Sequence, residues 1–203
     1  MAVLADNEIF KALKAKRLVV HPLLNKNQIK GARIDLRLDN IFYVIKRFAK
    51  TYYDPMNYMD TQKPEPYGEV KLISYGSSFA LHPGDYVLAP LFEFVKIPND
   101  LLGKLSGRSS LGRLGIIVHC TAEDVDPGYA GPLIVELANI GMFPVALYPL
   151  MEVASLTLEE MTGEATYPYR GKYGKIEDFP ETESKLYRHK KELRAILEMK
   201  RLA

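Results

Sequence analysis

The chain has 203 residues, 47% of them hydrophobic, so it can bury one sizeable core and is typical of globular rather than disordered proteins. Its 27 lysines and arginines nearly balance 25 aspartates and glutamates, and a net charge of +2 gives no support for general nucleic-acid binding. The single cysteine, Cys120, excludes an intrachain disulfide, and the sequence has neither a signal-peptide pattern nor an apolar run of about 18 residues. We therefore expect a cytoplasmic protein without a membrane partner.

The N-terminal part of the chain predicts one helix followed by strands. Residues 6–16 carry apolar side chains at helical spacing, and Asp6 is the candidate N-cap. Residues 17–24 predict a short strand ended by Pro22, and residues 32–45 alternate like a single longer strand. The polar, tyrosine-rich stretch 50–67 contains three prolines and predicts a long loop or an insertion.

The remainder of the chain predicts mostly short strands. Turn signals such as "HPGD", "IPND" and "DPGYAG" separate them, a spacing typical of a β-sandwich or barrel. The predicted strands cover residues 68–75, 85–90, 91–98, 114–119, 132–139, 143–148 and 151–158. The charged stretch 181–202 has a narrow apolar stripe and predicts a surface helix lying on the body or on a partner subunit.

One of these strands contains an isolated carboxylate. In "PLIVELANIG" (132–141), alternation places Leu133, Val135 and Leu137 on one face and Ile134, Glu136 and Ala138 on the other. Burying an unpaired carboxylate among aliphatic side chains is costly. Glu136 therefore belongs either to an exposed or interface-facing side of the strand, or to a functional site.

A second unusual stretch is "SGRSSLGRLG" (106–115), with two arginines, three serines and three glycines in ten positions. Glycines let a ligand approach the backbone, and serine hydroxyls and arginine guanidinium groups bind phosphate oxygens. The spacing does not match the nucleotide-binding loop Gly-x-x-x-x-Gly-Lys-Ser/Thr. An anion site and a structural Ser/Gly turn both remain open.

A third stretch, "DPGYAG" (126–131), predicts a tight turn by itself. Together, the stretch from Leu81 to Gly141, with its Ser-Arg-Ser-Ser core, its Asp-Pro-Gly-Tyr-x-Gly turn, "VHCTA" (118–122) and Glu136, closely resembles the dCTP deaminases of the trimeric dUTPase superfamily. The resemblance runs from about residue 5 to the "YPYRGKYGK" segment near residue 175.

This resemblance implies a mainly β fold, a distorted jelly roll or β-barrel of the dUTPase type with an N-terminal helix and a C-terminal helical tail, assembled as a homotrimer. We expect a deaminase-like domain over 1–178 and a charged helical extension over 179–203. The implied reaction is hydrolytic deamination of dCTP to dUTP and ammonia, as a step toward dTTP. The implied partners are dCTP and two further copies of the chain, with sites between subunits.

The resemblance also assigns roles to individual residues. Glu136 would be the catalytic acid/base, Ser109 and Arg113 would position the water and the departing amine, and the Ala122 carbonyl would orient that water. Main chain at Ile134 and Val135 would read the cytosine edge, and Asp126 would hold the sugar 3′-hydroxyl. The implied phosphate contacts are Arg108, Ser109 and Ser110. Leu111, Gly112 and Arg113 of the same turn would also bind substrate, and the implied lid contacts are Tyr169, Lys172 and Lys175.

No resident metal is expected. Zinc deaminases hold their metal with a His/Cys/Cys set that includes Pro-Cys-x-x-Cys, which this chain with its single cysteine lacks. A carboxylate must then move the proton. Magnesium would enter on the triphosphate rather than in a protein cage.

The sequence departs from the family pattern at two places. In "YPYRGKYGK" the spacing is shorter and the family's glutamine is missing. Family members that also hydrolyse dUTP to dUMP tend to carry glutamine where Ser155 stands, which favours deamination alone. A bifunctional deaminase and diphosphatase, a diphosphatase alone, and a non-catalytic nucleotide-binding regulator remain the alternatives.

Overall fold

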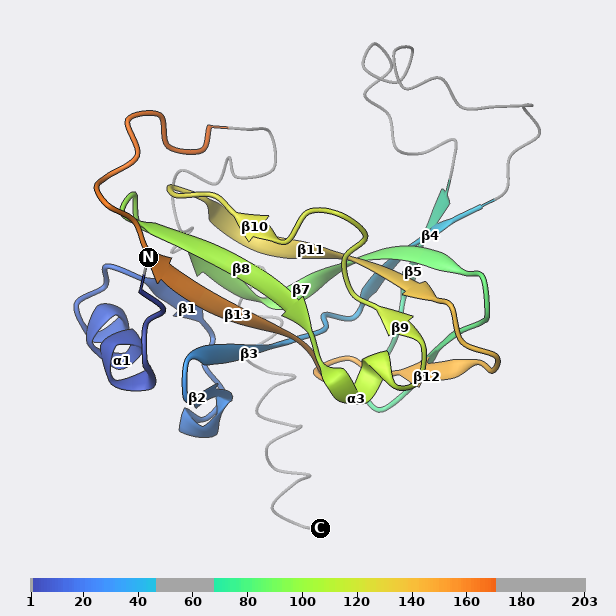
Figure 1. Ribbon diagram of the computed structural model, residues 1–203. Coiled ribbons are helices and arrows are strands. Elements are labelled where there is room, and N and C mark those ends of the chain that lie inside the picture. Colours follow the sequence, from blue (N-terminus) through green and yellow to red (C-terminus); the bar gives the residue numbers. More distant parts are fainter. Residues whose placement is uncertain (1, 47–67, 171–203) are drawn as a thin grey trace.

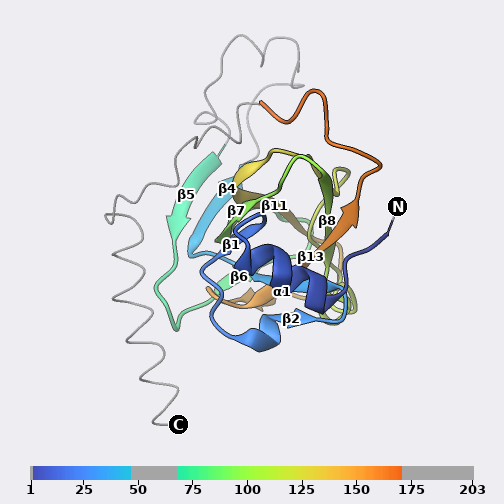
Figure 2. The ribbon, with the colours of Figure 1, turned by 90° about the vertical axis from the view of Figure 1, so that its left-hand side faces the viewer.

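The computed structural model describes residues 2–46 and 68–170, and two antiparallel sheets form most of the regular secondary structure in these ranges (Figure 1). The predicted mainly β architecture is confirmed. Figure 2 shows the two sheets facing each other, with helix α1 (Asp6–Lys14) beside them. Core side chains come from both sheets, for example Val87 and Val135 from one and Ile34 and Leu156 from the other.

The first sheet contains the long strands that carry Glu136. Its order is β5-β4-β7-β11-β9, with β1 also paired to β7. The bounds are β5 Gly68–Leu72, β4 Ile41–Ile45, β7 Tyr86–Lys96, β11 Ala130–Asn139, β9 Ile116–Ile117 and β1 Val19–His21.

The second sheet has the order β10-β8-β13-β3-β2, and a small separate pair joins β12 to β6. The bounds are β10 Asp124–Val125, β8 Leu101–Gly107, β13 Glu152–Glu160, β3 Arg33–Arg37, β2 Ile29–Lys30, β12 Val145–Leu147 and β6 Phe79–Leu81. Two short helices complete the described elements, the 3-10 helix η1 (Lys26–Gln28) and α3 (Ser109–Gly112).

The predicted strand over 32–45 is wrong, because the chain forms two strands there. β3 lies in the second sheet and β4 in the first. Between them, Leu38 donates its N–H to the Met151 carbonyl at 2.9 Å, and Asp39 donates to the Pro90 carbonyl at 3.0 Å. The chain thus changes sheets at a corner, a feature of packed antiparallel sheets that alternation along the sequence does not reveal.

Two other strand predictions need correction. The strands predicted at 85–90 and 91–98 form the single strand β7. β8 was not predicted, because its sequence LLGKLSG contains glycines, which are depleted in strands. The structure explains Gly103, since a Cβ there would lie 3.0 Å from Val125 Cβ and 3.1 Å from Leu156 Cδ1.

The N-terminal helix forms as predicted, but its cap differs. The N-cap residue is Ala5, in extended conformation, and Asp6 lies in the first turn. Ile9 and Ala12 are buried, whereas Phe10 is exposed.

Several predictions lie outside the described residues: the loop at 50–67, the helix at 181–202, the domain boundary after residue 178, and the sites Lys172 and Lys175. In the described ranges, no helix is both long and apolar enough to cross a membrane.

Candidate functional site

The serine-rich segment forms the turn between β8 and β9. Arg108 is extended, with φ −83° and ψ 131°, and its carbonyl accepts the N–H groups of Leu111 and Gly112, both at 3.0 Å. Leu111 is only 2% exposed and anchors the turn in the core. Ser109, Ser110, Gly112 and Arg113 are exposed. Leu111 could therefore reach a nucleotide through its main chain only.

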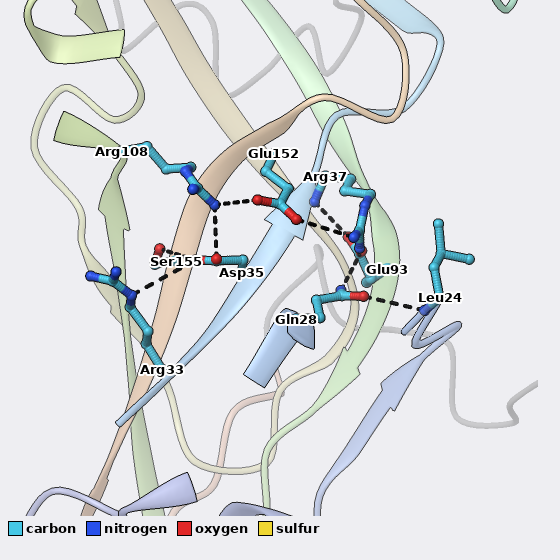
Figure 3. Close-up of polar contacts among 9 residues, drawn as sticks. All are labelled: Leu24, Gln28, Arg33, Asp35, Arg37, Glu93, Arg108, Glu152 and Ser155. Carbon is cyan, nitrogen blue, oxygen red and sulfur yellow. Dashed lines mark hydrogen bonds and ion pairs between the residues drawn. The ribbon is translucent and has the colours of Figure 1, made fainter. Parts of the chain in front are cut away.

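Arg108 is held by two carboxylates (Figure 3). Its Nη1 lies 2.8 Å from Asp35 Oδ2 and 2.5 Å from Glu152 Oε2. Asp35 also accepts a hydrogen bond from the Ser155 hydroxyl at 2.7 Å. Asp35 and Ser155 are buried, whereas the Arg108 side chain keeps 28% of its surface exposed.

These contacts continue into the core. The other oxygen of Glu152 lies 3.2 Å from Arg37 Nη2, and Arg37 Nη1 lies 3.2 Å from Glu93 Oε1. The Arg37 N–H and the Gln28 amide also donate to Glu93, at 2.8 and 2.7 Å. Burial raises the pKa of Glu93 to about 7, against the opposing effect of Arg37.

Glu136 lies on the outer face of β11, as the alternation predicts. Leu133, Val135 and Leu137 are buried in the core, whereas Glu136 is half-buried. The Glu136 N–H donates to the Val118 carbonyl, and Glu136 Oε2 accepts the Cys120 N–H, both at 2.9 Å. The segment after β9 therefore lies against β11 and fixes one oxygen of this carboxylate.

Two ionisable groups share the surroundings of Glu136. Burial, followed by the nearby Glu136 and Cys120, raises the pKa of Tyr86 to about 12. Desolvation and then Glu136 also raise the pKa of the Cys120 thiol, so this thiol stays protonated near neutral pH and is a poor nucleophile. Cys120 is exposed.

The segment that carries Ala122 also contains His119. Ala122 is exposed. The Nδ1 atom of His119 is buried and, among the described residues, has no hydrogen-bond partner.

The Asp126 turn lies near the other end of β11. The Tyr129 N–H donates to the Asp126 carbonyl at 3.1 Å, and Gly128 has φ +83°. Tyr129 is 8% exposed and packs at a tilt against Tyr169, with ring centroids 5.5 Å apart. The Tyr169 N–H donates to the Pro127 carbonyl at 2.8 Å, so Tyr169 is attached to this turn, where the Asp126 side chain is exposed.

The main chain at Ile134 and Val135 follows a register shift after Pro132. Ile134 pairs with Pro90, which has no N–H to donate to β11. The Ile134 side chain is 49% exposed on the face of Glu136, and Val135 is buried, so only its main chain is available to a ligand.

The predicted site residues fall into three groups within one chain. They are the α3 turn (Arg108–Arg113), the group around Glu136 with Ala122, and the Asp126 turn with Tyr169. Within residues 2–46 and 68–170, no hydrogen bond or ion pair joins one group to another.

The sequence analysis missed three residues around these groups: Asp35, Glu152 and Tyr86. Asp35 and Glu152 contact Arg108, and Tyr86 lies near Glu136. The sequence does show Asp35 and Glu152 as acidic residues within predicted strands, but their position in a strand does not reveal that both contact Arg108. The described residues contain no cluster of three or more His, Cys, Asp or Glu side chains that could hold a metal ion.

Comparison with known proteins shows which family this chain is similar to. A family model of dCTP deaminase-like proteins matches residues 3–161. A dUMP-forming dCTP deaminase of Dictyoglomus turgidum is 43% identical over 173 residues, covering 85% of this chain and 87% of the relative. One from Methanobrevibacter smithii is 41% identical over 169 residues, covering 83% and 86%. A dCTP deaminase of Thermomicrobium roseum is 38% identical over 176 residues, covering 85% and 86%.

The fold has a counterpart among solved structures. The 2′-deoxycytidine 5′-triphosphate deaminase from Agrobacterium tumefaciens superimposes with a TM-score of 0.61 at 21% identity, covering 78% of this chain and 48% of that one. This likeness concerns the fold. With a family model over residues 3–161 and relatives above 30% identity along most of its length, the chain belongs to the dCTP deaminase family.

Proposed function

We propose that this enzyme deaminates dCTP with Glu136 as its proton-transfer group. The observation that carries the proposal is the placement of Glu136, half-buried on the outer face of β11 with one oxygen fixed by the Cys120 N–H at 2.9 Å. A carboxylate has about four acceptor positions, so one such bond leaves capacity for a water and for the substrate amine.

In the proposed reaction, Glu136 takes a proton from a water whose oxygen attacks C4 of the cytosine ring. The C4–O bond forms while ring N3 gains a proton, and the exocyclic C4–N bond then breaks as Glu136 gives a proton to the amino group, which leaves as ammonia. The new C4 hydroxyl loses its proton to become the carbonyl, so the two protons of the water end on N3 and in ammonia. Ser109 and Arg113 position the water and the departing amine, and the Ala122 carbonyl orients the water. Main chain at Ile134 and Val135 reads the base.

The exposed α3 turn is proposed to bind the phosphates through Arg108, Ser109 and Ser110. Of the carboxylates near this turn, Asp35 and Glu152 are already bonded to Arg108, so the donors left for a ligand are hydroxyl, guanidinium and main-chain N–H groups. Such groups fit a magnesium ion carried by the triphosphate rather than one held by the protein. Bound there, magnesium neutralises part of the phosphate charge.

Asp126, Tyr169, Lys172 and Lys175 complete the proposed substrate contacts. Asp126 would accept a hydrogen bond from the sugar 3′-hydroxyl. Tyr169 would meet the nucleotide beside this turn, because its main chain is already bonded to Pro127. Lys172 and Lys175, outside the described residues, would add positive charge at the triphosphate.

The proposed assembly is a homotrimer with sites between subunits. It is supported by the lack, among the described residues of one chain, of any hydrogen bond or ion pair between the α3 turn and Glu136, because acid/base and positioning groups of one site must meet around the same substrate. Apolar side chains are also exposed close to α3, where Ile140 donates its N–H to the Gly115 carbonyl. The exposed set is Leu114, Ile140, Met142 and Phe143.

A second candidate function continues from dUTP to dUMP, with a water attacking the α-phosphorus and pyrophosphate leaving. The relatives from Dictyoglomus turgidum and Methanobrevibacter smithii are both named dUMP-forming, which favours it. Ser155, which favoured deamination alone, is 4% exposed and bonded to Asp35, so this position does not face a substrate pocket and does not oppose the candidate.

One incubation tests both candidates. The full chain is incubated with dCTP and magnesium, and dUTP, dUMP, pyrophosphate and ammonia are separated and quantified over time. Ammonia with dUTP alone supports deamination only. Ammonia with matching amounts of dUMP and pyrophosphate supports the second candidate, and no ammonia from dCTP contradicts both.

A further inference from the structure

Arg108, proposed above to bind phosphate, belongs to a partly buried polar network whose other members have no role in the proposed reaction. Three carboxylates, those of Asp35, Glu93 and Glu152, contact three guanidinium groups, those of Arg33, Arg37 and Arg108 (Figure 3). The Arg37 and Glu93 side chains are 6% and 0% exposed. Arg108 and Glu152, at 28% and 32%, form the end of the network that a ligand can reach.

Glu152 contacts both arginines through different oxygens. Oε1 lies 3.2 Å from Arg37 Nη2, and Oε2 lies 2.5 Å from Arg108 Nη1. The buried end of this bridge is fixed, because Arg37 is also paired with Glu93, which in turn accepts the Gln28 amide. Glu152 therefore lies between a rigid pair in the core and the exposed α3 turn.

The backbone supports the same link. β13 shifts register between Glu152 and Ala154, and such a bulge bends a strand and redirects its side chains. The Arg108 N–H donates to the carbonyl of Val153, inside this bulge, at 3.3 Å. Arg108 is thus attached to the first residues of β13 by its main chain and by its side chain.

The N–H donors of Arg108 that do not contact a carboxylate indicate what the contact between Glu152 and Arg108 could do. Both ion pairs use Nη1, so in the described ranges Nε and Nη2 have no partner. A free arginine side chain samples many rotamers and loses that freedom when it binds. One that is held in advance by charge-assisted bonds avoids most of this loss.

We infer that Glu152 is a positioning residue for Arg108, holding its guanidinium so that Nε and Nη2 face the phosphate groups of the nucleotide. The guanidinium groups of Arg33, Arg37 and Arg108 match the three carboxylates of the network in number, so the contact with Glu152 orients Arg108 without leaving a net negative charge beside it. The inference rests on the proposed function, in which Arg108 binds phosphate.

The test compares Glu152→Ala with Glu159→Ala in the full chain. Glu159 lies on the same strand and makes no ion pair in the described part of the chain, so it controls for the loss of a carboxylate from β13. Glu152→Ala should raise the KM for dCTP roughly 10-fold with little change in kcat. Calorimetry should show tripolyphosphate binding weakened in parallel, whereas the inhibition constant of deoxycytidine, which has no phosphate, should stay unchanged.

A double variant separates positioning from a general loss of structure. In an Arg108→Ala background, Glu152→Ala should raise the KM for dCTP no further, because there is no guanidinium left to orient. Glu152→Gln should lie between wild type and Glu152→Ala, since one amide oxygen can accept from one arginine.

Three outcomes would overturn the inference: an unchanged or lowered KM for dCTP in folded Glu152→Ala, equal effects on tripolyphosphate and deoxycytidine, or a further rise in the Arg108→Ala background. If Glu152→Ala does not fold, Glu152→Gln takes its place in the test. A Glu152→Gln variant with the wild-type KM for dCTP and wild-type tripolyphosphate binding would then refute the inference. Wild type that binds tripolyphosphate without deaminating dCTP would refute the proposed function only.

Discussion

Glu136 and Glu93 are both glutamates in neighbouring strands of one sheet, and their surroundings give them different chemistry. Glu136 is half-buried on the outer face of β11 and accepts one main-chain N–H. Glu93 is fully buried on β7 and accepts N–H groups from Arg37 and Gln28. The Glu136 carboxylate is therefore accessible to a substrate, whereas the buried Glu93 carboxylate contributes to the stability of the fold.

We expect Glu136→Gln to lower kcat for dCTP deamination by at least ~10²–10⁴-fold, because the amide cannot take a proton from water. The glutamine oxygen can still accept the Cys120 N–H, so nucleotide binding should persist. Steady-state kinetics and calorimetric titration with dCTP measure the two effects. Glu160→Gln, an exposed change at the end of β13, should leave both at wild-type values. Deamination by Glu136→Gln near the wild-type rate would refute the proposed role.

The raised pKa of Glu93 leads us to expect that the stability of the protein depends on pH. Its pKa in the folded protein, about 7, is above the ordinary value of 4.5. The folded state therefore binds more protons than the unfolded state between these values, and the resulting stabilisation is full below pH 4.5 and is lost as the pH rises through 7. The free energy of unfolding should fall by on the order of 2 kcal/mol from this group between pH 5 and 8.

Glu93→Gln isolates this contribution, because every other titrating group is the same in both proteins. Urea unfolding at pH 5 and pH 8 should show a smaller decrease in the variant than in wild type. The variant should also be less stable overall, since its amide cannot accept all the donors that surround Glu93. Parallel pH profiles would show that Glu93 does not titrate in this window.

At the scale of elements, tight turns between strands position side chains such as Asp126, and they depend on glycines with left-handed backbone angles. The Asp126–Tyr129 turn needs a left-handed residue at Gly128, and the His82–Asp85 turn needs one at Gly84. The two glycines have φ +83° and +82°, but only Gly128 is enclosed. A Cβ at Gly128 would lie 2.7 Å from Pro168 Cβ and 3.3 Å from the Tyr169 nitrogen, whereas a Cβ at Gly84 meets nothing within 4 Å.

This difference makes Gly84→Ala a matched control for Gly128→Ala. Both variants should lose about 1–2 kcal/mol of stability from the left-handed backbone. Gly128→Ala should lose more, because the added methyl group displaces Pro168, and it should raise the KM for dCTP by moving Asp126 and Tyr169. Urea unfolding and steady-state kinetics measure these effects. Equal losses in the two variants, with unchanged KM, would show that the contact with Pro168 and Tyr169 does not matter.

At the scale of the whole molecule, the proposed site is completed by other copies of the chain. Light scattering should give a mass near three chains of 23.0 kDa. A fully active monomer would contradict this assembly.

Mixed assemblies test the division of the site between subunits. Arg113→Ala and Glu136→Gln should each be inactive alone. After joint unfolding and refolding, mixed trimers should regain part of the activity, because a site can then combine an intact Arg113 from one chain with an intact Glu136 from another. Mixing without refolding is the control. No regain would place both residues of a site in the same chain.

The sequence by itself determined the features that depend on neighbouring residues. Alternation along residues 132–139 is enough to separate the buried face of β11 from the face of Glu136, because successive side chains of a strand point to opposite sides. The Asp126 turn was also predictable, since proline fixes one backbone angle and glycine permits the left-handed one.

Only the tertiary structure decided which distant residues meet. Arg108 contacts Glu152, 44 residues away, and Glu152 contacts Arg37, 115 residues away. Periodicity reports which face a side chain occupies, whereas its partner depends on strand order, register and bulges. The corner that divides residues 32–45 between two sheets was missed for the same reason, because a change of sheet is fixed by hydrogen bonds to segments far along the chain.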